Sequence, residues 1–393
     1  MPLDRPVLTT EDVHATSVAA FAPAPSQQWG LEVEVLVGRG CDPCGRPGLD
    51  ELPSRADLPS GTRVTVEPGG QLEISTLPHS HVDDALDTVA ADEEALAARV
   101  ADAGLRMLPG AVDVYRRPAR ILDLPRYRAM EAFFDSGGPD GRHMMCNTAS
   151  LQVNVSNHPS EPGRRWQLLH TLGPVLVATF ANSPGRDAGG RSWASLRQRI
   201  WAGIDPGRTA APDLNGDPVE AWTRYAMDAD VMLIRTGDDV VDLAPGMSFG
   251  SWMRHGHPAG WPSAEDLAYH LTTLFPPIRP RGWLELRMLD ALPPAVREVA
   301  VVLIAAAIVE PVASELEARM PDTTGWWSAA ARHGLRHPGL AAAADLLFDI
   351  AAPALPGVTY RANRAEGVLD YRESHVRQRL QPWAAPTALT RIG

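Results

Sequence analysis

Polar side chains separated by a single residue recur in four strand-like segments, and they are the side chains of this chain best suited to chemistry. The pairs are Glu32 with Glu34, Gln71 with Glu73, Gln152 with Asn154, and Glu285 with Arg287. Successive side chains of a β-strand point to opposite faces, so both members of each pair lie on one face. If the strands are neighbours, one face of a sheet is lined with carboxylates.

Carboxylates packed at this density repel one another unless a cation lies among them. Hard divalent ions such as Mg²⁺ prefer oxygen ligands, so the pattern predicts a metal site on the sheet. A single pair of this kind is more often the solvated face of a half-exposed sheet. Four pairs in one chain favour the metal site.

Length and composition suit one large globular unit with small-molecule partners. The chain has 393 residues, of which 45% are hydrophobic, so it can bury a substantial core. The formal net charge is -12 and no basic run is present. This charge disfavours a nucleic-acid or anionic-membrane surface as the main role. We expect no nucleic-acid or membrane partner, and a monomer.

The sequence contains no lysine, so all 36 of its Lys+Arg residues are arginine. A P-loop and a protein kinase both need a lysine beside the phosphates, and Schiff-base chemistry also needs one. These classes of enzyme are therefore excluded. Any phosphate that binds here must be held by arginine, backbone N–H groups and metal.

The cysteines indicate a reducing compartment. Cys41, Cys44 and Cys146 are too few for a disulfide-stapled secreted protein of this length. Cys41 and Cys44 form one CxxC, which reads as a turn more readily than as a zinc or redox site, because structural zinc needs four ligands. Residues 1–10 carry no apolar signal-peptide core, and the apolar run 299–309 is too short to cross a bilayer. We expect a cytoplasmic protein.

The pattern along the chain predicts an α+β fold with a mostly antiparallel sheet. Strands are expected at 29–37, 64–76, 148–155 and 283–288, with a break in the second at Glu67-Pro68-Gly69-Gly70. Helices are expected at 82–103, 166–181 and over much of the chain after Pro294. The irregular segments 185–191, 205–218 and 255–262 are expected to rim an active-site mouth.

Six motifs in a fixed order resemble the glutamate–cysteine ligases of the plant and bacterial type. They are GLEVE at 30–34, EPGGQLEIS at 67–75, Met144-Met145 with Thr148 and Gln152-Val153-Asn154, ANSP at 181–184, Ser195-Leu196-Arg197 with Ile200-Trp201, and RPRGWLELR at 279–287 with Asp290. The segment 279–290 and Met144-Met145-Cys146 are most similar to the actinobacterial branch that makes γ-glutamylcysteine for ergothioneine synthesis.

The resemblance implies a curved, mostly antiparallel β-sheet that forms an active-site cup flanked by helices, as in glutamine synthetase. It implies one catalytic domain over 1–393, with the sheet-forming motifs at about 30–290 and a helical part at about 294–393. The implied reaction joins the γ-carboxylate of L-glutamate, activated by ATP as γ-glutamyl phosphate, to the amine of L-cysteine. The co-substrate would be ATP and the cofactor Mg²⁺.

The resemblance also implies roles for individual residues. Those implied as Mg²⁺ ligands are Glu32, Glu34, Glu67, Glu73 and Glu285. Those implied in catalysis at the transferring phosphate are Arg287, Arg281 and Glu285. Those implied in binding the amino-acid substrate are Arg197, Thr148 and Gln71, and those implied in binding ATP are Gln152, Asn154 and Arg281. Taken alone, Arg197 would read as a surface residue of a helix.

Two departures from the family pattern and two rival functions stay open. Ser156 stands where the family commonly has an aspartate, and Cys146-Asn147 replaces a basic pair of the plant members. Because no motif specifies cysteine, a related ligase with a different amine acceptor is the first alternative. The second is a non-catalytic protein that senses glutamate or nucleotide.

Overall fold

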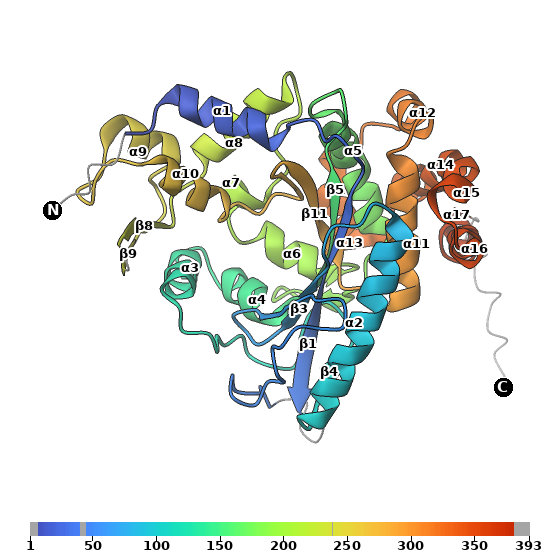
Figure 1. The fold of residues 1–393 in the computed structure, drawn as a ribbon, viewed down its shortest axis with the longest axis horizontal. Helices are drawn as coiled ribbons and strands as arrows, with labels where there is room; N and C mark the ends of the chain where they lie inside the picture. Colours follow the sequence, from blue (N-terminus) through green and yellow to red (C-terminus); the bar gives the residue numbers. More distant parts are fainter. Residues whose placement is uncertain (1–6, 40–44, 238, 381–393) are drawn as a thin grey trace, which may run out of the picture.

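The computed structural model describes residues 7–39, 45–237 and 239–380, so Cys41 and Cys44 lie outside the described residues. Within these residues, its central element is an antiparallel sheet of seven strands (Figure 1). Six of them follow the order β10-β11-β5-β1-β3-β2, and β4 pairs with β1. The strands of this sheet are β1 (Trp29–Arg39), β2 (Val64–Val66), β3 (Leu72–Ser75), β4 (Leu105–Leu108), β5 (Ser150–Ser156), β10 (Ile278–Pro280) and β11 (Trp283–Asp290).

Every pairing in this sheet is antiparallel, which confirms the predicted fold class. The strands expected around 29–37, 64–76, 148–155 and 283–288 are all present, and the second is divided into β2 and β3 at the predicted break. Two small hairpins lie outside the sheet. They are β6 (Gly185–Arg186) with β7 (Ser192–Trp193), and β8 (Leu233–Thr236) with β9 (Asp239–Asp242).

Helices cover the sheet and form most of the C-terminal part. Those before β10 are α1 (Thr10–Ala20), α2 (Val82–Asp102), α3 (Pro125–Asp135), α4 (Asp140–Asn147), α5 (Arg164–Thr179), α6 (Leu196–Ala202), α7 (Pro206–Thr209), α8 (Pro218–Asp228), α9 (Phe249–His255) and α10 (Ala264–Leu271). Those after β11 are α11 (Pro294–Ala307), α12 (Val312–Arg319), α13 (Trp327–His333), α14 (Pro338–Ala351), α15 (Leu355–Val358), α16 (Ala362–Tyr371) and α17 (Gln378–Leu380). Shorter helical turns are η1 (Thr324–Trp326), η2 (Gly334–Arg336), η3 (Ala352–Ala354) and the π-helical η4 (Arg372–Arg377).

The core lies between the sheet and the helices on one of its faces. Figure 1 shows α2 and α11 along this side, with α14 to α17 beyond them, whereas α3, α4 and α6 lie on the other side. On the face of the sheet that is turned toward these helices, apolar residues of β1 and β5, such as Leu31, Val33 and Val153, are buried in the core. Alternation along each strand therefore sends the apolar side chains to the core and the paired polar side chains to the opposite face.

The apolar helices after β11 are core helices in this arrangement. Among the described residues, Pro338–Val358 has the length and hydropathy of a membrane span, and α11 with α12 would be a second only if this sharply bent pair were one segment. Leu340, Leu347 and Phe348 of α14 are buried in the main core cluster. The assignment of the whole chain to one catalytic domain stays a prediction.

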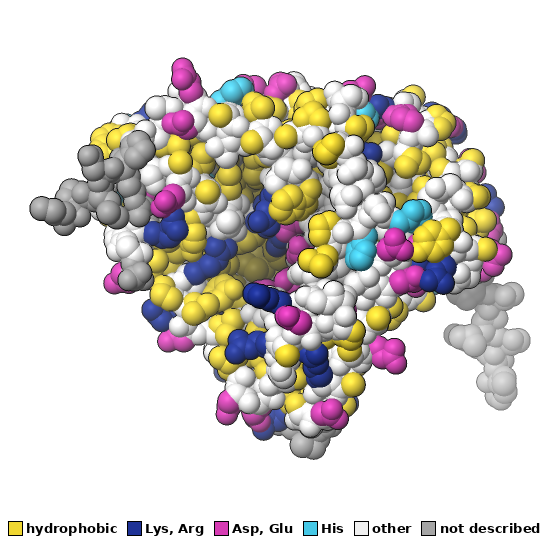
Figure 2. Space-filling model, viewed as in Figure 1, with side chains coloured by type: hydrophobic (Ala, Val, Ile, Leu, Met, Phe, Trp, Pro, Cys, Tyr) yellow, Lys and Arg dark blue, Asp and Glu magenta, His cyan; other side chains and the backbone are white. Residues whose placement is uncertain are grey.

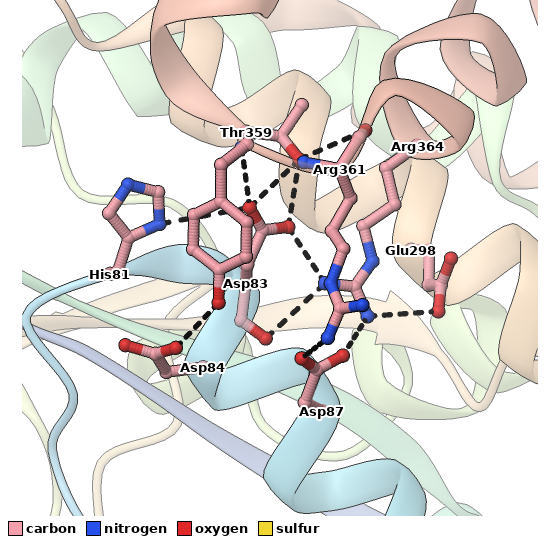
Figure 3. Close-up of polar contacts among 9 residues, drawn as sticks. His81, Asp83, Asp84, Asp87, Glu298, Thr359, Arg361 and Arg364 are labelled. Atoms are coloured by element: carbon pink, nitrogen blue, oxygen red, sulfur yellow. Dashed lines mark hydrogen bonds and ion pairs between the residues drawn. The ribbon is translucent and has the colours of Figure 1, made fainter.

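An ion-pair network joins the start of α2 to the C-terminal helices (Figure 3). The fully buried Asp83 carboxylate accepts hydrogen bonds from Thr359 Oγ1 at 2.8 and 2.9 Å, from Tyr360 N at 2.7 Å and from Arg364 Nη1 at 2.7 Å. Arg364 also donates to Asp87 at 2.7 Å. Asp83 and Asp87, in the first two turns of α2, thus anchor α16, and Asp83 also has a favourable place at the helix N-terminus.

Candidate active site

A cavity of about 340 Å³ opens on the polar face of the sheet. Figure 2 shows the molecule hollowed near the centre of this view, with basic and acidic side chains beside the hollow. The predicted site residues that line the cavity are Glu32, Glu34, Glu67, Gln71, Glu73, Thr148, Gln152, Arg281, Glu285 and Arg287. The structure therefore brings together most of the residues singled out in the sequence.

The strand register explains why the carboxylates meet. Glu34 of β1 lies directly opposite Glu73 of β3, and Glu32 lies opposite Gln152 of β5. Directly opposed residues on one face of an antiparallel pair bring their Cβ atoms to about 5 Å. Glu67 joins them from the turn between β2 and β3. One side of the cavity is therefore an acidic wall, which we define as Glu32, Glu34, Glu67 and Glu73.

The acidic wall holds its protons more tightly than ordinary carboxyl groups do. Burial, with repulsion from Glu285 and Glu73, raises the pKa of Glu32 to about 7. Burial, with repulsion from Glu73 and Glu34, raises the pKa of Glu67 to about 8. Burial also raises the pKa of Glu34 and, with repulsion from Glu34, that of Glu73. Each of these shifts reports a negative charge that the protein alone does not neutralise.

The acidic wall is not a closed metal cage as it stands. Over the described ranges of the chain, no three His, Cys, Asp or Glu side chains converge into a ready-made metal site. Glu34 instead accepts a hydrogen bond from Ser150 N at 2.8 Å, and Glu32 accepts one from Asn154 Nδ2 at 2.9 Å. The assignment of these residues as Mg²⁺ ligands stays a prediction.

Arginines gather around Glu285, on strands β10 and β11 and the turn between them, at the other end of the same sheet. Arg279, its register partner on β10, donates from Nε at 2.7 Å and from Nη2 at 3.0 Å, in the fork geometry that suits a carboxylate. Arg287 Nη1 donates at 2.5 Å, and Arg281 Nη1 lies 3.7 Å away. Burial alone would raise the pKa of Glu285, but Arg287 and Arg279 outweigh it and lower the pKa to about 2. We define Arg279, Arg281 and Arg287 as the arginine wall.

A β-bulge places Arg287 in the cavity. The register between β11 and β5 shifts between Leu286 and Leu289, where β11 carries one extra residue. Bulges turn side chains in new directions beside active sites. The Arg287 side chain is 13% exposed, and its Nη1 also donates to Gln152 Oε1 at 2.6 Å. Because its Nε is buried without a partner among the described residues, the guanidinium retains a free donor.

The turn before β3 needs its two glycines. A Cβ atom on Gly69 would lie 2.3 Å from the carbonyl oxygen of Cys146, and Gly70 has a φ of 90°, in the left-handed region. Arg46 fastens the same contact by donating to Gly69 O and to Cys146 O. The turn therefore lies directly on the end of α4, and Gln71, which follows the turn, donates to the backbone of Met145 and Thr148.

Gln71 presents a fixed acceptor to the cavity. Its Nε2 donates to Thr148 O at 2.9 Å and to Met145 O at 3.3 Å, which fixes the orientation of the amide. Its Oε1 is buried and has no partner among the residues that the structure describes. Such an atom is suited to an N–H donor from a ligand. Thr148 also lines the cavity, although its hydroxyl donates to Met144 O at 2.8 Å.

Two predicted site residues lie outside the lining. Arg197 is 1% exposed and sits behind Trp201, with Nη2 donating to Arg287 O at 3.0 Å and the guanidinium 5.0 Å from the Trp201 ring. Asn154 lines a neighbouring cavity instead. Its Nδ2 donates to Glu32, and its Oδ1 accepts from Trp283 Nε1 at 3.0 Å. The roles assigned to both residues stay predictions.

The rim of the cavity was wrongly predicted. The segments 185–191, 205–218 and 255–262 contribute no lining residue, within the part of the chain that the structure describes. Helix α3 and the chain after α10 take their place, with Arg126, Tyr127, Met130, Thr272 and Phe275. No motif marks these residues, because tertiary packing alone brings α3 over the sheet. The adjacent basic and aromatic residues Arg126 and Tyr127 were the signal in the sequence that could have pointed to this part of the rim.

Ser156 closes the end of the sheet where the family commonly has an aspartate. Its Oγ accepts a hydrogen bond from Gln28 N at 2.8 Å, and its backbone O accepts one from Arg165 Nη1 at 2.8 Å. The hydroxyl thus caps the backbone before β1, which a serine can do as well as an aspartate.

Comparison with known proteins agrees with this geometry. The family model described as Glutamate-cysteine ligase family 2 matches residues 28–346. Glutamate–cysteine ligase EgtA of Mycolicibacterium smegmatis is 39% identical over 346 residues, which cover 84% of this chain and 81% of that protein. The chloroplastic glutamate–cysteine ligase B of Oryza sativa subsp. japonica is 28% identical, over 73% of this chain and 63% of that protein.

A solved structure shares the fold at low sequence identity. The glutamate–cysteine ligase of Francisella tularensis, in complex with AMP, has a TM-score of 0.56 and 15% identity, over 91% of this chain and 83% of that chain. At this identity the likeness concerns the fold alone. The family match covers most of the described chain, including every strand of the sheet. This chain therefore belongs to the glutamate–cysteine ligase family 2.

Proposed function

We propose that this protein joins L-glutamate to L-cysteine at the expense of ATP, and that ergothioneine biosynthesis uses the γ-glutamylcysteine. The observation that carries the proposal is the pairing of an acidic wall with an arginine wall in one cavity. Phosphoryl transfer between two anions requires their charge to be neutralised, and these walls supply the groups that can do so. Membership of the family and the 39% identity to EgtA support the substrate assignment.

The acidic wall fits a divalent cation. Four buried carboxylates with raised pKa values carry charge that a cation would neutralise, and their oxygens are the donors that Mg²⁺ prefers. Glu32, Glu34, Glu67 and Glu73 would hold the ion, whose role when bound is to neutralise the phosphate oxygens. Because Arg279 and Arg287 already engage Glu285, that residue is the weakest of the five proposed ligands.

The chain's own residues orient the reactants in this proposal. The γ-carboxylate oxygen of glutamate attacks the terminal phosphorus of ATP and ADP leaves. The amine nitrogen of cysteine then attacks the carbonyl carbon of the γ-carboxyl group, loses a proton and displaces phosphate. Arg287 and Arg281 would stabilise the transferring phosphoryl group with preorganised N–H donors. Gln71 Oε1 would accept an N–H of the incoming amine and so direct its nitrogen, because the amide is held by two backbone carbonyls.

We propose that the neighbouring cavity is a shelf for the nucleotide base, called the base shelf below. It has a volume of about 450 Å³ and is lined by Gly30, Pro78, Asn154 and Trp283, among others, and it shares Glu32 with the catalytic cavity. Trp283 is 41% exposed, and the Arg281 guanidinium lies over one face of its ring, 5.1 Å from the ring centre, so a base would stack on the other face. Asn154 ties this ring to Glu32. We therefore place the base of ATP beside Trp283.

Substitution of Trp283 by alanine is expected to weaken ATP binding more than catalysis. Stacking of a base on an aromatic ring contributes about 1–3 kcal/mol, so the KM for ATP should rise about tenfold with little change in kcat. Steady-state kinetics at saturating glutamate and cysteine would measure this. Trp261→Ala, at another exposed tryptophan outside both cavities, is the control. An unchanged KM for ATP in Trp283→Ala would place the base elsewhere.

Magnesium is expected to stabilise the protein more at alkaline than at acid pH. The pKa values of Glu32 and Glu67 are raised to about 7 and about 8, so the stability associated with their protonated forms is lost as pH rises through these values. Protons and metal compete for the same oxygens. The rise in melting temperature on adding Mg²⁺ should therefore be larger at about pH 8.5 than at about pH 6.

Thermal unfolding with MgCl₂, against NaCl of equal ionic strength, measures this difference. A magnesium effect that is equal at both pH values, or larger at the acid one, would contradict the assignment of the acidic wall.

The experiment that tests the proposed function is phosphate release from Mg-ATP with L-glutamate, with and without L-cysteine, with mass spectrometry of the products. Cysteine-dependent release with γ-glutamylcysteine is the expected result. Release that responds only to another amine would replace the acceptor and keep the mechanism. No turnover with any amine would favour the non-catalytic sensor. The proposed cytoplasmic location and monomeric state need separate measurements by fractionation and light scattering.

A further inference from the structure

A third cavity, of about 590 Å³, is separate from the catalytic cavity and from the base shelf. It is bounded by α5, by the irregular segment 210–215, and by the chain from Asp322 to Trp327. It shares no lining residue with the catalytic cavity or with the base shelf, within the described chain. The segment 205–218, which does not rim the active site, thus contributes to a different hollow. The proposed reaction gives this hollow no role.

His170 is an unsatisfied acceptor in the wall of this cavity. The residue is 0% exposed, and its Nδ1 lies 2.8 Å from Trp166 O one turn earlier on α5. This contact requires the proton on Nδ1, because a carbonyl oxygen can only accept. Burial lowers the pKa of His170 to about 4, so the ring is neutral. Its Nε2, on the ring side away from that carbonyl, is buried without a partner among the described residues.

Trp327 forms the aromatic side of the cavity. Its ring lies against α5 at Gly173, where a Cβ atom would come within 2.2 Å of the ring, so only glycine allows this contact. The indole Nε1 is buried and, among the described residues, has no acceptor. The wall therefore offers an unused donor at Trp327 as well as an unused acceptor at His170. A buried polar atom without a partner is costly, and a ligand can remove that cost.

The charge at the rim of the cavity determines which sign of ligand charge is favoured. Asp213 and Asp322 line the cavity, and hydrogen bonds from Asn215 and from Thr324, respectively, lower the pKa of each carboxyl group. Both carboxylates are thus ionised at neutral pH. No arginine is found among the lining residues of the described chain. The cavity therefore favours a cation and disfavours an anion.

We propose that this cavity is a binding site for a small organic amine that also carries an oxygen acceptor, such as an amino alcohol or an amino-acid ester. The ammonium group donates to His170 Nε2 and is neutralised by Asp213 and Asp322. The oxygen of the ligand accepts from Trp327 Nε1, and the carbon skeleton lies against the indole face, where a cation is also favoured.

The occupant would be connected to the catalytic cavity through α13. Trp327 is the first residue of α13, and Ala331 on the same helix accepts hydrogen bonds from Ser195 N at 2.8 Å and Ala194 N at 3.0 Å. Ser195 Oγ in turn caps α6 by accepting from Gln198 N at 3.1 Å. Helix α6 carries Arg197, which contacts Arg287. We therefore expect the amine to change the KM for glutamate, a step that rests on the proposed function.

Isothermal calorimetry with L-phenylalaninol tests the binding site without reference to activity. The matched probes are 3-phenyl-1-propanol, which lacks the amine, and 3-phenylpropanoate, which is an anion. We expect saturable binding of phenylalaninol alone. The doubly substituted variant Asp213→Asn with Asp322→Asn should weaken binding at least about tenfold. Both positions are exposed and asparagine keeps their acceptors, so folding should be retained. The exposed Asp370→Asn is the control and should bind as the parent does.

Equal binding of the anion, no saturable heat with phenylalaninol, or unchanged affinity in the doubly substituted variant would each overturn the site. His170→Phe, checked by its melting temperature, should likewise lose binding. In the kinetic arm, phenylalaninol should shift the KM for glutamate in the parent and not in the doubly substituted variant. Binding without such a shift would overturn the connection to α6, whereas a protein without ligase activity would leave the calorimetric result valid.

Discussion

Arg287→Met is expected to lower kcat by about 1000-fold, with a much smaller change in the KM for ATP. The guanidinium contacts Glu285 and Gln152 at once, and the bulge in β11 fixes it in the cavity before substrate arrives. A preorganised charge that acts on the transferring phosphoryl group stabilises the transition state more than the ground state. Methionine keeps much of the volume and removes the charge. Steady-state kinetics of phosphate release measures the loss.

Two further variants make this result interpretable. Arg287→Lys keeps a positive charge but lacks the unpartnered Nε donor and the planar set of N–H groups, so its kcat should fall between those of the parent and Arg287→Met. Arg254→Met, at an exposed arginine on α9, should behave as the parent. If Arg287→Met folds normally and its kcat stays within about tenfold of the parent, the arginine wall does not act on the phosphoryl group.

Glu67→Gln is expected to stabilise the metal-free protein and to inactivate it. The pKa of Glu67 is raised to about 8 by burial and by its acidic neighbours, so at about pH 8.5 the folded state must carry an unfavourable charge. Glutamine removes this charge at nearly constant shape. The melting temperature without metal should rise by about 2–4 °C for each kcal/mol gained.

Activity should move in the opposite direction. Loss of one anionic ligand weakens the cation that neutralises the phosphates, so kcat should fall at least about 100-fold. Thermal unfolding and phosphate release on the same preparation measure both effects. Glu94→Gln, at an exposed position of α2, should change neither. A variant that is less stable than the parent without metal would show that the Glu67 charge is already compensated.

The sequence predicts the sheet and its polar face because both depend on local periodicity. Alternation in β1, β3, β5 and β11 identifies the strands and also places Glu32, Gln152 and Glu285 on a common face. Contacts across the cavity depend on register and on packing, which no single segment encodes. The pairing of Arg279 with Glu285 follows from the register of β10 and β11, and Tyr127 reaches the cavity only because α3 packs over it.

Arg197 illustrates the limit of a motif. The pattern Ser195-Leu196-Arg197 marks an important arginine, and the structure buries that arginine completely, yet behind Trp201 and outside the cavity lining. The spacing of apolar residues in a short helix indicates which face of the helix is buried. It does not indicate whether other side chains lie between a buried residue and a ligand.

The guanidinium groups around Glu285 have one more chemical property that suits the proposed reaction. An acyl phosphate is an acylating agent, and a neutral amine in the cavity would capture it irreversibly as an amide. Lysine could supply such an amine, whereas arginine stays protonated at any physiological pH and is a poor nucleophile. Because the sequence contains no lysine, no lysine side chain can become acylated by the enzyme's own intermediate. This route of self-modification, the transfer of the glutamyl group to a lysine of the enzyme, is therefore closed.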